Sequence, residues 1–289
     1  MDSAGSPFGI LRHRSRLAVP LLHIVLVLLA LVFVFPMLWM ISTSLKTIDA
    51  TMVFPPKWIP WPPQWHNYRD AIAYIPFWTY TFNTVLICVM AILGTVLSNA
   101  LVAYSFARLT WPGRDVLFGF TLATMMVPFP VVMVPLYGVF RELGLIGTTL
   151  PMWVPSWFAG AFNIFLLRQF FMRIPSNLAE AAQIDGASEF RIFWRIYLPL
   201  AAPALAVIAL FQFIGSWNDF LGPLLYLPDQ SSFTLALGLQ FYQSQHGGTQ
   251  WHLLMAASVL TVLPVVVVFF LTQRTFLQGL TFLKNTEAT

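Results

Sequence analysis

Residues 174–200, IPSNLAEAAQIDGASEFRIFWRIYLPL, predict two short helices joined by a sharp turn. Asn177 can cap the first helix, and Glu180, three residues later, can complete a capping box. We expect this helix over residues 178–185, with Gly186 ending it in the left-handed conformation. The interior of the helix holds three alanines, Ala179, Ala181 and Ala182. A helix with such small side chains can approach a neighbour closely, so the segment predicts a compact protruding element.

The second helix of this segment follows Ser188, whose side chain can cap it. Four aromatic residues fall at i, i+3, i+4 and i+7, which places them on one face: Phe190, Phe193, Trp194 and Tyr197. We expect this face to pack on membrane helices. Arg191 and Arg195 share another face, within reach of lipid phosphates. On this pattern alone, an ordinary amphipathic connector is as good an interpretation as a specialised element.

The whole chain is too apolar to fold in water. Of its 289 residues, 58% are hydrophobic and only 9% are charged, and the mean hydropathy is +0.75. A soluble domain carries about 25% charged residues, so this chain needs lipid as its solvent. The composition excludes a soluble enzyme, a disordered tail and a DNA-binding domain. The pI of 9.4 reflects a net charge of only +4, which does not indicate nucleic acid as a partner.

Six runs without Lys, Arg, Asp or Glu are long enough to cross a bilayer. A charge at the centre of a spanning helix costs roughly 2.5–3.5 kcal/mol, and a span needs about 20 apolar residues. The most apolar parts of these runs are 17–41, 83–106, 116–140, 150–168, 198–217 and 253–273. The first is too long for a signal peptide, so we expect an anchor. The sequence therefore predicts an all-α polytopic membrane protein with six transmembrane helices over residues 17–281.

The basic residues predict the orientation of these spans. Most Lys and Arg residues precede the first span, follow the last, or lie between spans two and three or four and five. Cytoplasmic loops carry such an excess. We therefore expect both terminal segments, 1–16 and 282–289, and the loop 174–200 to be cytoplasmic. The polar stretch 240–250 is then an outer loop.

Residues 46–70 form a second distinctive loop, on the predicted outer side. It combines prolines and tryptophans: Pro55, Pro56, Pro60, Pro62, Pro63, Trp58, Trp61 and Trp65. The prolines predict an extended chain. The tryptophans are typical of an aromatic belt at the membrane interface, and a contact with an external partner is the alternative.

The chain has no phosphate-binding loop. Such a loop needs the pattern GxxxxGK[ST], and no Gly-Lys pair occurs. Cys88 is the only cysteine, which excludes a disulfide framework and a thiolate metal site. We therefore expect no cofactor and no metal, and any ATPase that drives the chain must be another polypeptide.

Two other classes of membrane protein are alternatives. A proton- or ion-coupled secondary carrier normally buries an acid or a base along its pathway. The six apolar cores hold none, and Asp219 falls at the outer end of the fifth span. An intramembrane serine protease needs a serine beside a histidine or an acid. No GxSxG occurs, and His23 is the one histidine in a core.

Polar side chains within the spans are candidates for contact with a transported solute. Four amides lie there, Asn83, Asn99, Asn163 and Gln212. Such amides more often form interhelical hydrogen bonds than bind a ligand. Gln212, Trp217 and Asn218, around the end of the fifth span, are candidate pathway residues. Trp217 can either stack on a sugar or belong to the interfacial belt. Gln212 and Asn218 are six residues apart, which places them about 120° from each other around a regular helix.

Residues 174–200 also carry a family signature. Glu180-Ala181-Ala182, then Gly186, then Ile196, Leu198 and Pro199 match the EAA loop of ABC-importer permeases. Further matching pieces are Asn67-Tyr68-Arg69, Pro135-Leu136-Tyr137, Leu143-Gly144-Leu145, Phe165–Phe171, Ile184–Ser188, Trp217–Phe220 and Gly279-Leu280-Thr281. Over about residues 20–281 the chain resembles the carbohydrate-uptake branch, specifically the smaller permease subunit of maltose-type transporters.

The resemblance implies a type I ABC importer permease in a bacterial inner membrane. In that family a second permease subunit completes a heterodimer, a cytoplasmic ATPase dimer drives it, and an extracytoplasmic solute-binding protein delivers a sugar. The resemblance gives an ATPase-coupling role to five residues, Glu180, Ala181, Ala182, Asp185 and Gly186. Relatives continue after the match to Thr281 with small residues that this chain lacks, so a contact of the tail with the ATPase is not implied. The solute is left open among oligosaccharides, disaccharides, monosaccharides and glycerol phosphates.

Overall fold

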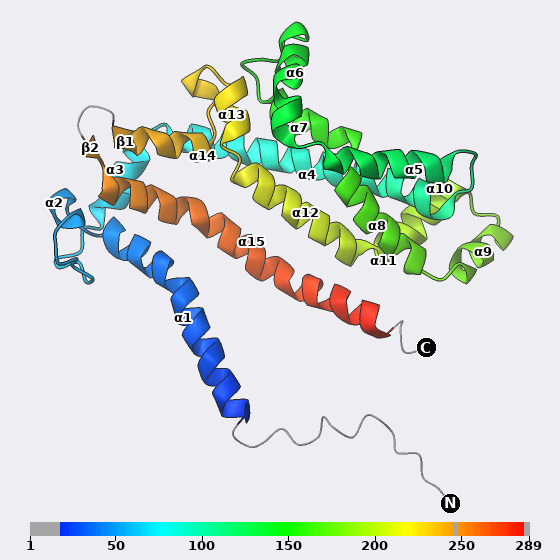
Figure 1. Ribbon diagram of the computed structural model, residues 1–289, viewed down its shortest axis with the longest axis horizontal. Coiled ribbons are helices and arrows are strands. Elements are labelled where there is room, and N and C mark those ends of the chain that lie inside the picture. Colours follow the sequence, from blue (N-terminus) through cyan, green and yellow to red (C-terminus); the bar gives the residue numbers. More distant parts are fainter. Residues whose placement is uncertain (1–17, 245–247, 286–289) are drawn as a thin grey trace, which may run out of the picture.

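The computed structural model describes residues 18–244 and 248–285, which form an elongated assembly of helices (Figure 1). The longer helices are α1 (Ala18–Ser44), α4 (Phe77–Arg108), α8 (Ala161–Arg173), α12 (Ala202–Trp217) and α15 (Trp251–Asn285). The shorter ones are α2 (Ile48–Thr51), α3 (His66–Tyr74), α5 (Arg114–Ala123), α6 (Phe129–Glu142), α7 (Leu150–Trp153), α9 (Asn177–Ile184), α10 (Glu189–Ile192), α11 (Leu198–Leu200), α13 (Leu221–Tyr226) and α14 (Leu235–Gly238). One antiparallel hairpin pairs β1 (Gln243–Ser244) with β2 (Gly248–Thr249). The predicted amino-terminal segment 1–16 and residues 286–289 of the predicted tail lie outside the described residues.

Four segments of the described chain are long and apolar enough to cross a membrane, Val19–Ser44, Phe77–Arg108, Leu150–Arg173 and Trp251–Gln273. Two further segments are bent helix pairs. Arg114–Met126 and Phe129–Glu142 meet at 100°, and Glu189–Leu200 and Ala202–Trp217 meet at 75°. The predicted six spans are reached when each bent pair counts as one span. The all-α polytopic fold class is confirmed.

The prediction of one uninterrupted helix over 116–140 is wrong, and a proline explains the break. Val127 precedes Pro128 and is extended, with φ −85° and ψ 112°. A residue before proline avoids the helical region because the proline ring crowds its backbone. Pro128 is extended as well, with φ −72° and ψ 143°, and α6 begins only at Phe129.

The span predicted over 198–217 is also bent, again at prolines. Pro203 follows Pro199 by four residues, at the junction between α11 and α12. Pro203 has no N–H group to donate to the carbonyl of Pro199, so the helical hydrogen-bond ladder is interrupted there. The segment before the bend therefore runs at an angle to α12 and belongs to the loop 174–200.

Helix α4 is the centre of the packing. Around its carboxyl-terminal half, α8, α12 and the loop 174–200 enclose one buried cluster, which includes Tyr104, Leu167 and Ile208. Around its amino-terminal half, α3, α14 and α15 enclose another, which includes Tyr80 and Tyr242. Helix α1 meets α15 at one end and then diverges from it (Figure 1). None of the residues in the most apolar stretch of α1 is buried.

Most amides of the spans join helices, as predicted. Asn99 on α4 accepts a hydrogen bond from the backbone N–H of Gly160 (2.7 Å), where the chain kinks before α8. Gln212 on α12 accepts one from the hydroxyl of Thr95 on α4 (2.9 Å). Asn83 donates to two backbone carbonyls of the segment before α14, both at 3.0 Å. These bonds satisfy polar groups that the membrane would otherwise leave unpaired.

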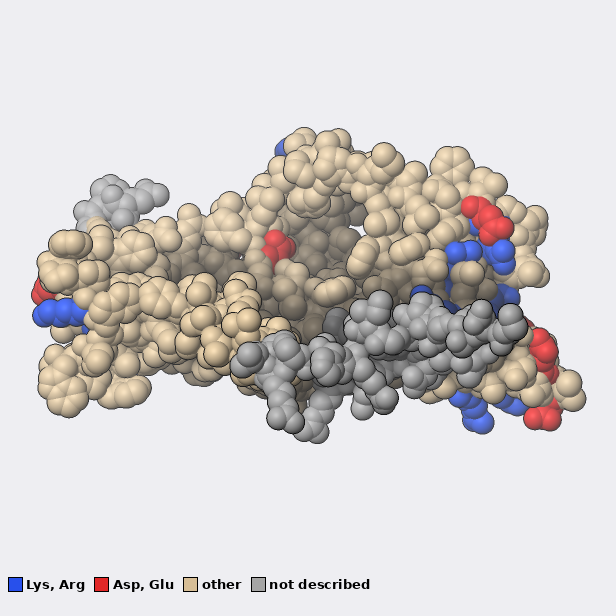
Figure 2. All heavy atoms as spheres, turned by 60° about the horizontal axis from the view of Figure 1, so that its bottom comes forward, with Lys and Arg blue, Asp and Glu red and all other residues tan. Residues whose placement is uncertain are grey.

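Charged side chains gather at the two ends of the molecule on the face that Figure 2 shows. Between them lies a broad, mostly uncharged belt, with one basic group at its upper edge and one acidic group in its hollowed middle. A chain whose middle lies in hydrocarbon requires this distribution, because a charge costs most at the centre of the bilayer.

Candidate coupling site

Helix α9 extends beyond the end of the helices around α4, at the right of Figure 1. It covers Asn177–Ile184, one residue earlier than predicted, and its amino terminus corrects the capping prediction. Ser176 occupies the cap position with helical dihedrals, and no side chain caps the helix. The Ser176 carbonyl instead accepts hydrogen bonds from the N–H groups of Ala179 (2.9 Å) and Glu180 (3.0 Å). Because the chain is already helical at Ser176, Asn177 lies inside the helix and the predicted box with Glu180 does not form.

The carboxyl terminus of α9 confirms the predicted glycine turn. Gly186 has φ +76°, in the left-handed region. Its N–H donates to the carbonyl of Gln183 (3.0 Å), and the N–H of Ala187 donates to the carbonyl of Ala182 (2.9 Å). These two bonds are those of a Schellman motif, which satisfies the last carbonyls of a helix. The turn is therefore held by the backbone itself.

One face of α9 packs inward and the other is open. Ala179 and Ala182 lie against the buried cluster at the end of α4, so the small side chains permit a close approach, as predicted. The outer face and the turn carry the other predicted coupling residues, all of them exposed: Glu180, Ala181, Asp185 and Gly186. Ile184 is 87% exposed at the tip. This apolar side chain and the residues around it are therefore accessible to another protein.

The second helix of the loop begins as predicted and then departs from an α-helix. Ser188 caps α10, since its hydroxyl accepts a hydrogen bond from the N–H of Arg191 (3.4 Å). Phe193–Tyr197 then forms a π-helical turn. The turn leads through α11 to the bend at Pro203.

The predicted aromatic face of this helix is only half right. Phe193 and Tyr197 are buried, at 3% and 0% exposed, whereas Phe190 and Trp194 are 66% and 39% exposed. Ile192 is buried as well, at 0% exposed, so the buried face is turned away from Phe190 and Trp194. The buried face consequently becomes Ile192, Phe193 and Tyr197.

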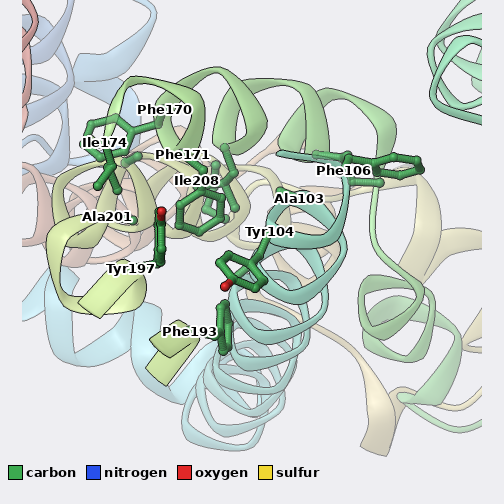
Figure 3. Packing of buried hydrophobic residues seen from close by; sticks show 14 of the residues in the cluster. Ala103, Tyr104, Phe106, Phe170, Phe171, Ile174, Phe193, Tyr197, Ala201 and Ile208 are labelled. Carbon is green, nitrogen blue, oxygen red and sulfur yellow. The ribbon is translucent and has the colours of Figure 1, made fainter. Parts of the chain in front are cut away.

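An aromatic cluster attaches the loop to the membrane helices (Figure 3). Tyr104 on α4 lies 5.1 Å from both Phe193 and Tyr197 and 6.1 Å from Phe171 on α8, measured between ring centroids. The rings of these residues meet edge-on or tilted, as aromatic pairs prefer. The loop is thus in direct contact with both α4 and α8.

Two charged side chains reinforce this attachment. Arg108, at the end of α4, donates to the carbonyls of Phe171 and Ile174 and lies over the ring of Tyr197 at 4.9 Å. Glu189, at the start of α10, accepts a hydrogen bond from the hydroxyl of Tyr104 (2.9 Å). The guanidinium holds the end of α8, and the carboxylate holds the start of α10.

Glu189 also reaches the protruding helix. Its second oxygen accepts a hydrogen bond from the side-chain amide of Gln183 on α9 (2.8 Å). One carboxylate therefore bridges α9, α10 and α4. Neither Glu189 nor Tyr104 is predicted from the sequence. The available signal was an acid directly after a cap residue and a tyrosine near the basic end of a span, and both are common patterns.

The candidate pathway residues around the end of α12 have partners within the chain. The Trp217 ring is buried (3% exposed) and its N–H donates to the carbonyl of Thr261 on α15 (3.0 Å). The amide nitrogen of Gln212 donates to Ser216 (2.9 Å). Asn218 is exposed and donates to the carbonyl of Ile214 (2.8 Å). A contact of Gln212, Trp217 or Asn218 with a solute stays a prediction.

Asp219 lies two residues before α13, and its carboxylate accepts a hydrogen bond from the N–H of Gly222 in that helix (3.0 Å). Burial raises the pKa of Asp219, and the backbone N–H groups of Gly222 and Leu221 oppose that rise. Gly222 leaves the space for the carboxylate, because a Cβ there would lie 2.4 Å from its oxygen. These contacts give Asp219 a structural role that needs no proton transfer.

The structure thus defines a class, a multi-pass helical membrane protein that carries a short, rigid helix beyond the end of its bundle. Residues 99–281 match the family model described as binding-protein-dependent transport system inner membrane component. The chain belongs to this family. It is therefore a permease component of a transport system and not an enzyme.

Individual relatives agree with the family. The chain is 34% identical over 267 residues to the arabinooligosaccharides transport system permease protein of Halalkalibacterium halodurans, covering 90% of this chain and 94% of that one. It is 34% identical to the diacetylchitobiose uptake system permease protein of Streptomyces coelicolor (87% and 84% covered). It is 35% identical to the sn-glycerol-3-phosphate transport system permease protein of Yersinia enterocolitica (89% and 94% covered).

A solved structure confirms the fold. A chain of a bacterial ABC transporter involved in the import of the acidic polysaccharide alginate superposes with a TM-score of 0.81, covering 94% of this chain and 100% of that one. The two sequences are 24% identical. The predicted fold of an ABC importer permease is correct.

Proposed function

We propose that the chain forms half of the translocation pathway of an ATP-driven importer of sugars or closely related solutes, and that α9 couples it to a separate cytoplasmic ATPase. The solute class rests on the relatives, whose names specify arabinooligosaccharides, diacetylchitobiose and sn-glycerol-3-phosphate. Which of these chemistries the chain accepts depends on the solute-binding protein that serves it.

The observation that carries the coupling proposal is the exposed tip of α9. Ile184 is 87% exposed, although a glycine turn and a carboxylate bridge hold the helix rigidly. Burying one such side chain fully contributes about 1.5–3 kcal/mol. If a groove on the ATPase binds Ile184, a movement of the ATPase would move α9. The ring contacts of Tyr104 would transmit this movement to α4. Glu180, Ala181, Asp185 and Gly186 would surround Ile184 in that contact.

The exposed surface of α1 is an argument for a second permease subunit. Its most apolar stretch contacts little of its own chain and stands apart from the main bundle. In a heterodimer this helix would lie against the partner permease or the lipid around it. The pathway would then run between the two subunits, with Gln212, Trp217 and Asn218 as this chain's candidate contacts.

ATP dependence tests the proposed function. Uptake of the three relatives' solutes is measured with labelled compounds in cells that carry the chain with its neighbouring transport genes. We expect at least one of these solutes to accumulate. Uptake should stop when ATP is depleted and continue when an uncoupler collapses the proton gradient. Uptake that survives ATP depletion but stops with the uncoupler would instead identify a proton-coupled carrier.

Orientation gives a second prediction. With Cys88→Ser as background, a cysteine at Gln243 near the hairpin should react with an impermeant maleimide in intact cells. A cysteine at Ser188 should react only after the membrane is opened, because the basic loops on its side are cytoplasmic. The opposite labelling pattern would reverse the proposed topology and remove α9 from the ATPase side.

A further inference from the structure

Lys46 is a buried cation that has no anionic partner among the described residues. It follows the last residue of α1 by two positions and is 2% exposed. Its ammonium nitrogen lies 3.3 Å from the Thr43 hydroxyl and 3.9 Å from the centroid of the Trp39 ring. The ion pairs of the described residues involve other side chains. Burial lowers the pKa of Lys46, because an ammonium out of water needs an opposite charge.

The position of Lys46 is fixed by its surroundings. The side-chain amide of Asn67, itself 1% exposed, donates to the carbonyls of Ser44 and Lys46, both at 2.8 Å. The Ser44 hydroxyl is 2.8 Å from that of Tyr68, and the N–H of Gln64 donates to the carbonyl of Leu45 (3.0 Å). Helix α3 and the residues before it thus hold the turn rigidly, which is what a preformed ligand site requires.

A cavity of about 280 Å³ opens beside Lys46. Its lining includes Lys46, Thr47, Lys57, Ile59, Trp61 and Gln64. Two lysines, a threonine and a glutamine therefore line one cavity, and none of its lining residues is acidic. This is the chemistry that recognises a phosphate.

The rim of the cavity places it at the surface of the membrane. Ile59 and Trp61 are 81% and 88% exposed, and Phe54 nearby in the chain is 92% exposed. Trp58 folds back on α1 and lies 5.4 Å from Phe35 and 4.8 Å from Trp39. Since α1 is a membrane span, the loop lies at the depth where tryptophans and lipid phosphates meet.

We propose that this cavity, the Lys46 pocket, binds the phosphate of an anionic membrane phospholipid. Lys46 and Lys57 provide the positive charge, and Ile59 and Trp61 contact the glycerol and the first part of the acyl chains. A soluble phosphate has the same headgroup chemistry, but it would leave the exposed apolar rim uncovered. The bound lipid would fix the loop 46–65 relative to α1.

The test uses the complete transporter, purified in detergent and reconstituted in nanodiscs of phosphatidylcholine with or without phosphatidylglycerol. Native mass spectrometry counts the retained lipid, and thermal unfolding is followed in parallel. We expect the wild type to retain phosphatidylglycerol and to unfold at a higher temperature when it is present. Lys46→Met should weaken retention about tenfold, as expected when one charge-assisted bond is lost. It should also abolish the thermal shift.

Two controls separate the pocket from general surface charge. Lys57→Met should weaken retention less than Lys46→Met, because Lys57 is exposed. Arg69→Gln removes an exposed basic residue outside the cavity lining and should change nothing. Lys46→Met should be at least as stable as the wild type in phosphatidylcholine alone, since methionine buries no charge.

Three results would overturn the proposal. Equal retention of phosphatidylglycerol by the wild type and Lys46→Met would show that the pocket does not bind it. Displacement of the lipid by millimolar inorganic phosphate would identify a soluble phosphate as the ligand. Unchanged lipid binding combined with loss of the solute-binding protein from Lys46→Met would identify an acidic segment of that protein as the occupant.

Discussion

Gly186→Val should lower uptake about five- to thirtyfold while the protein stays in the membrane. The left-handed conformation at φ +76° costs a β-branched residue about 1–2 kcal/mol, and each 1.4 kcal/mol is about a factor of ten. No atom lies within 4 Å of a Cβ built at this position, so the added side chain would clash with nothing. The penalty falls on the backbone turn alone, and therefore on the shape of α9. Uptake, membrane level and co-purified ATPase are measured in the same membranes.

Two matched variants test whether the loss of uptake comes from the left-handed turn at this position. Gly186→Asn should keep most of the uptake, because asparagine enters the left-handed region more readily. Gly113→Val makes the same change at another left-handed glycine with open surroundings, in the turn between α4 and α5. It should leave ATPase retention unchanged. If Gly186→Val transports normally, or fails only because the protein disappears, α9 is a connector and not the coupling element.

Tyr104→Phe should uncouple ATP hydrolysis from transport. It removes one hydroxyl, the donor to Glu189 at 2.9 Å, and keeps the ring that packs on Phe193 and Tyr197. A hydrogen bond to a charged group contributes about 1.5–3 kcal/mol. We expect uptake to fall at least tenfold and the ATP hydrolysed per solute to rise. Glu189→Ala should lower uptake at least as much, since it removes this acceptor and also the bond to Gln183.

A double variant and a control make this prediction specific. Tyr104→Phe combined with Glu189→Ala should be no worse than Glu189→Ala alone, because removal of the carboxylate already breaks the bond to Tyr104. Tyr68→Phe removes a comparable tyrosine hydrogen bond at the other end of the molecule, to Ser44. It should leave the ratio of ATP to solute unchanged. Additive losses in the double variant would show that the bond does not transmit the coupling.

Much of the architecture follows from rules that act within a few residues. The spans are visible because a charge in the bilayer is costly, and the left-handed turn is visible because Gly186 follows a short helix. The bend after Val127 follows from an equally local rule, the effect of Pro128 on the residue before it. It was missed because the hydrophobic run continues unchanged through the proline.

Other features depend on contacts between distant segments. Two of the four predicted aromatic residues lie outside the core, and no local pattern marks the π-helical turn at Phe193–Tyr197. Glu189 and Tyr104 are 85 residues apart in the sequence. Trp217 is another case, since its hydrogen bond to Thr261 is set by how α12 lies on α15. Only the packing of whole helices brings these groups together.

A photocrosslinking measurement tests the central claim most directly. A photoreactive amino acid is placed at Ile184, at the tip of α9, and for comparison at Trp61, which is equally exposed in the loop after α2, at the opposite end of the molecule. The complete transporter is then irradiated in native membranes and the crosslinked chains are identified by mass spectrometry. The account predicts a crosslink from position 184 to the ATPase subunit and none from position 61. No ATPase adduct from position 184, with the transporter intact and active, would contradict it.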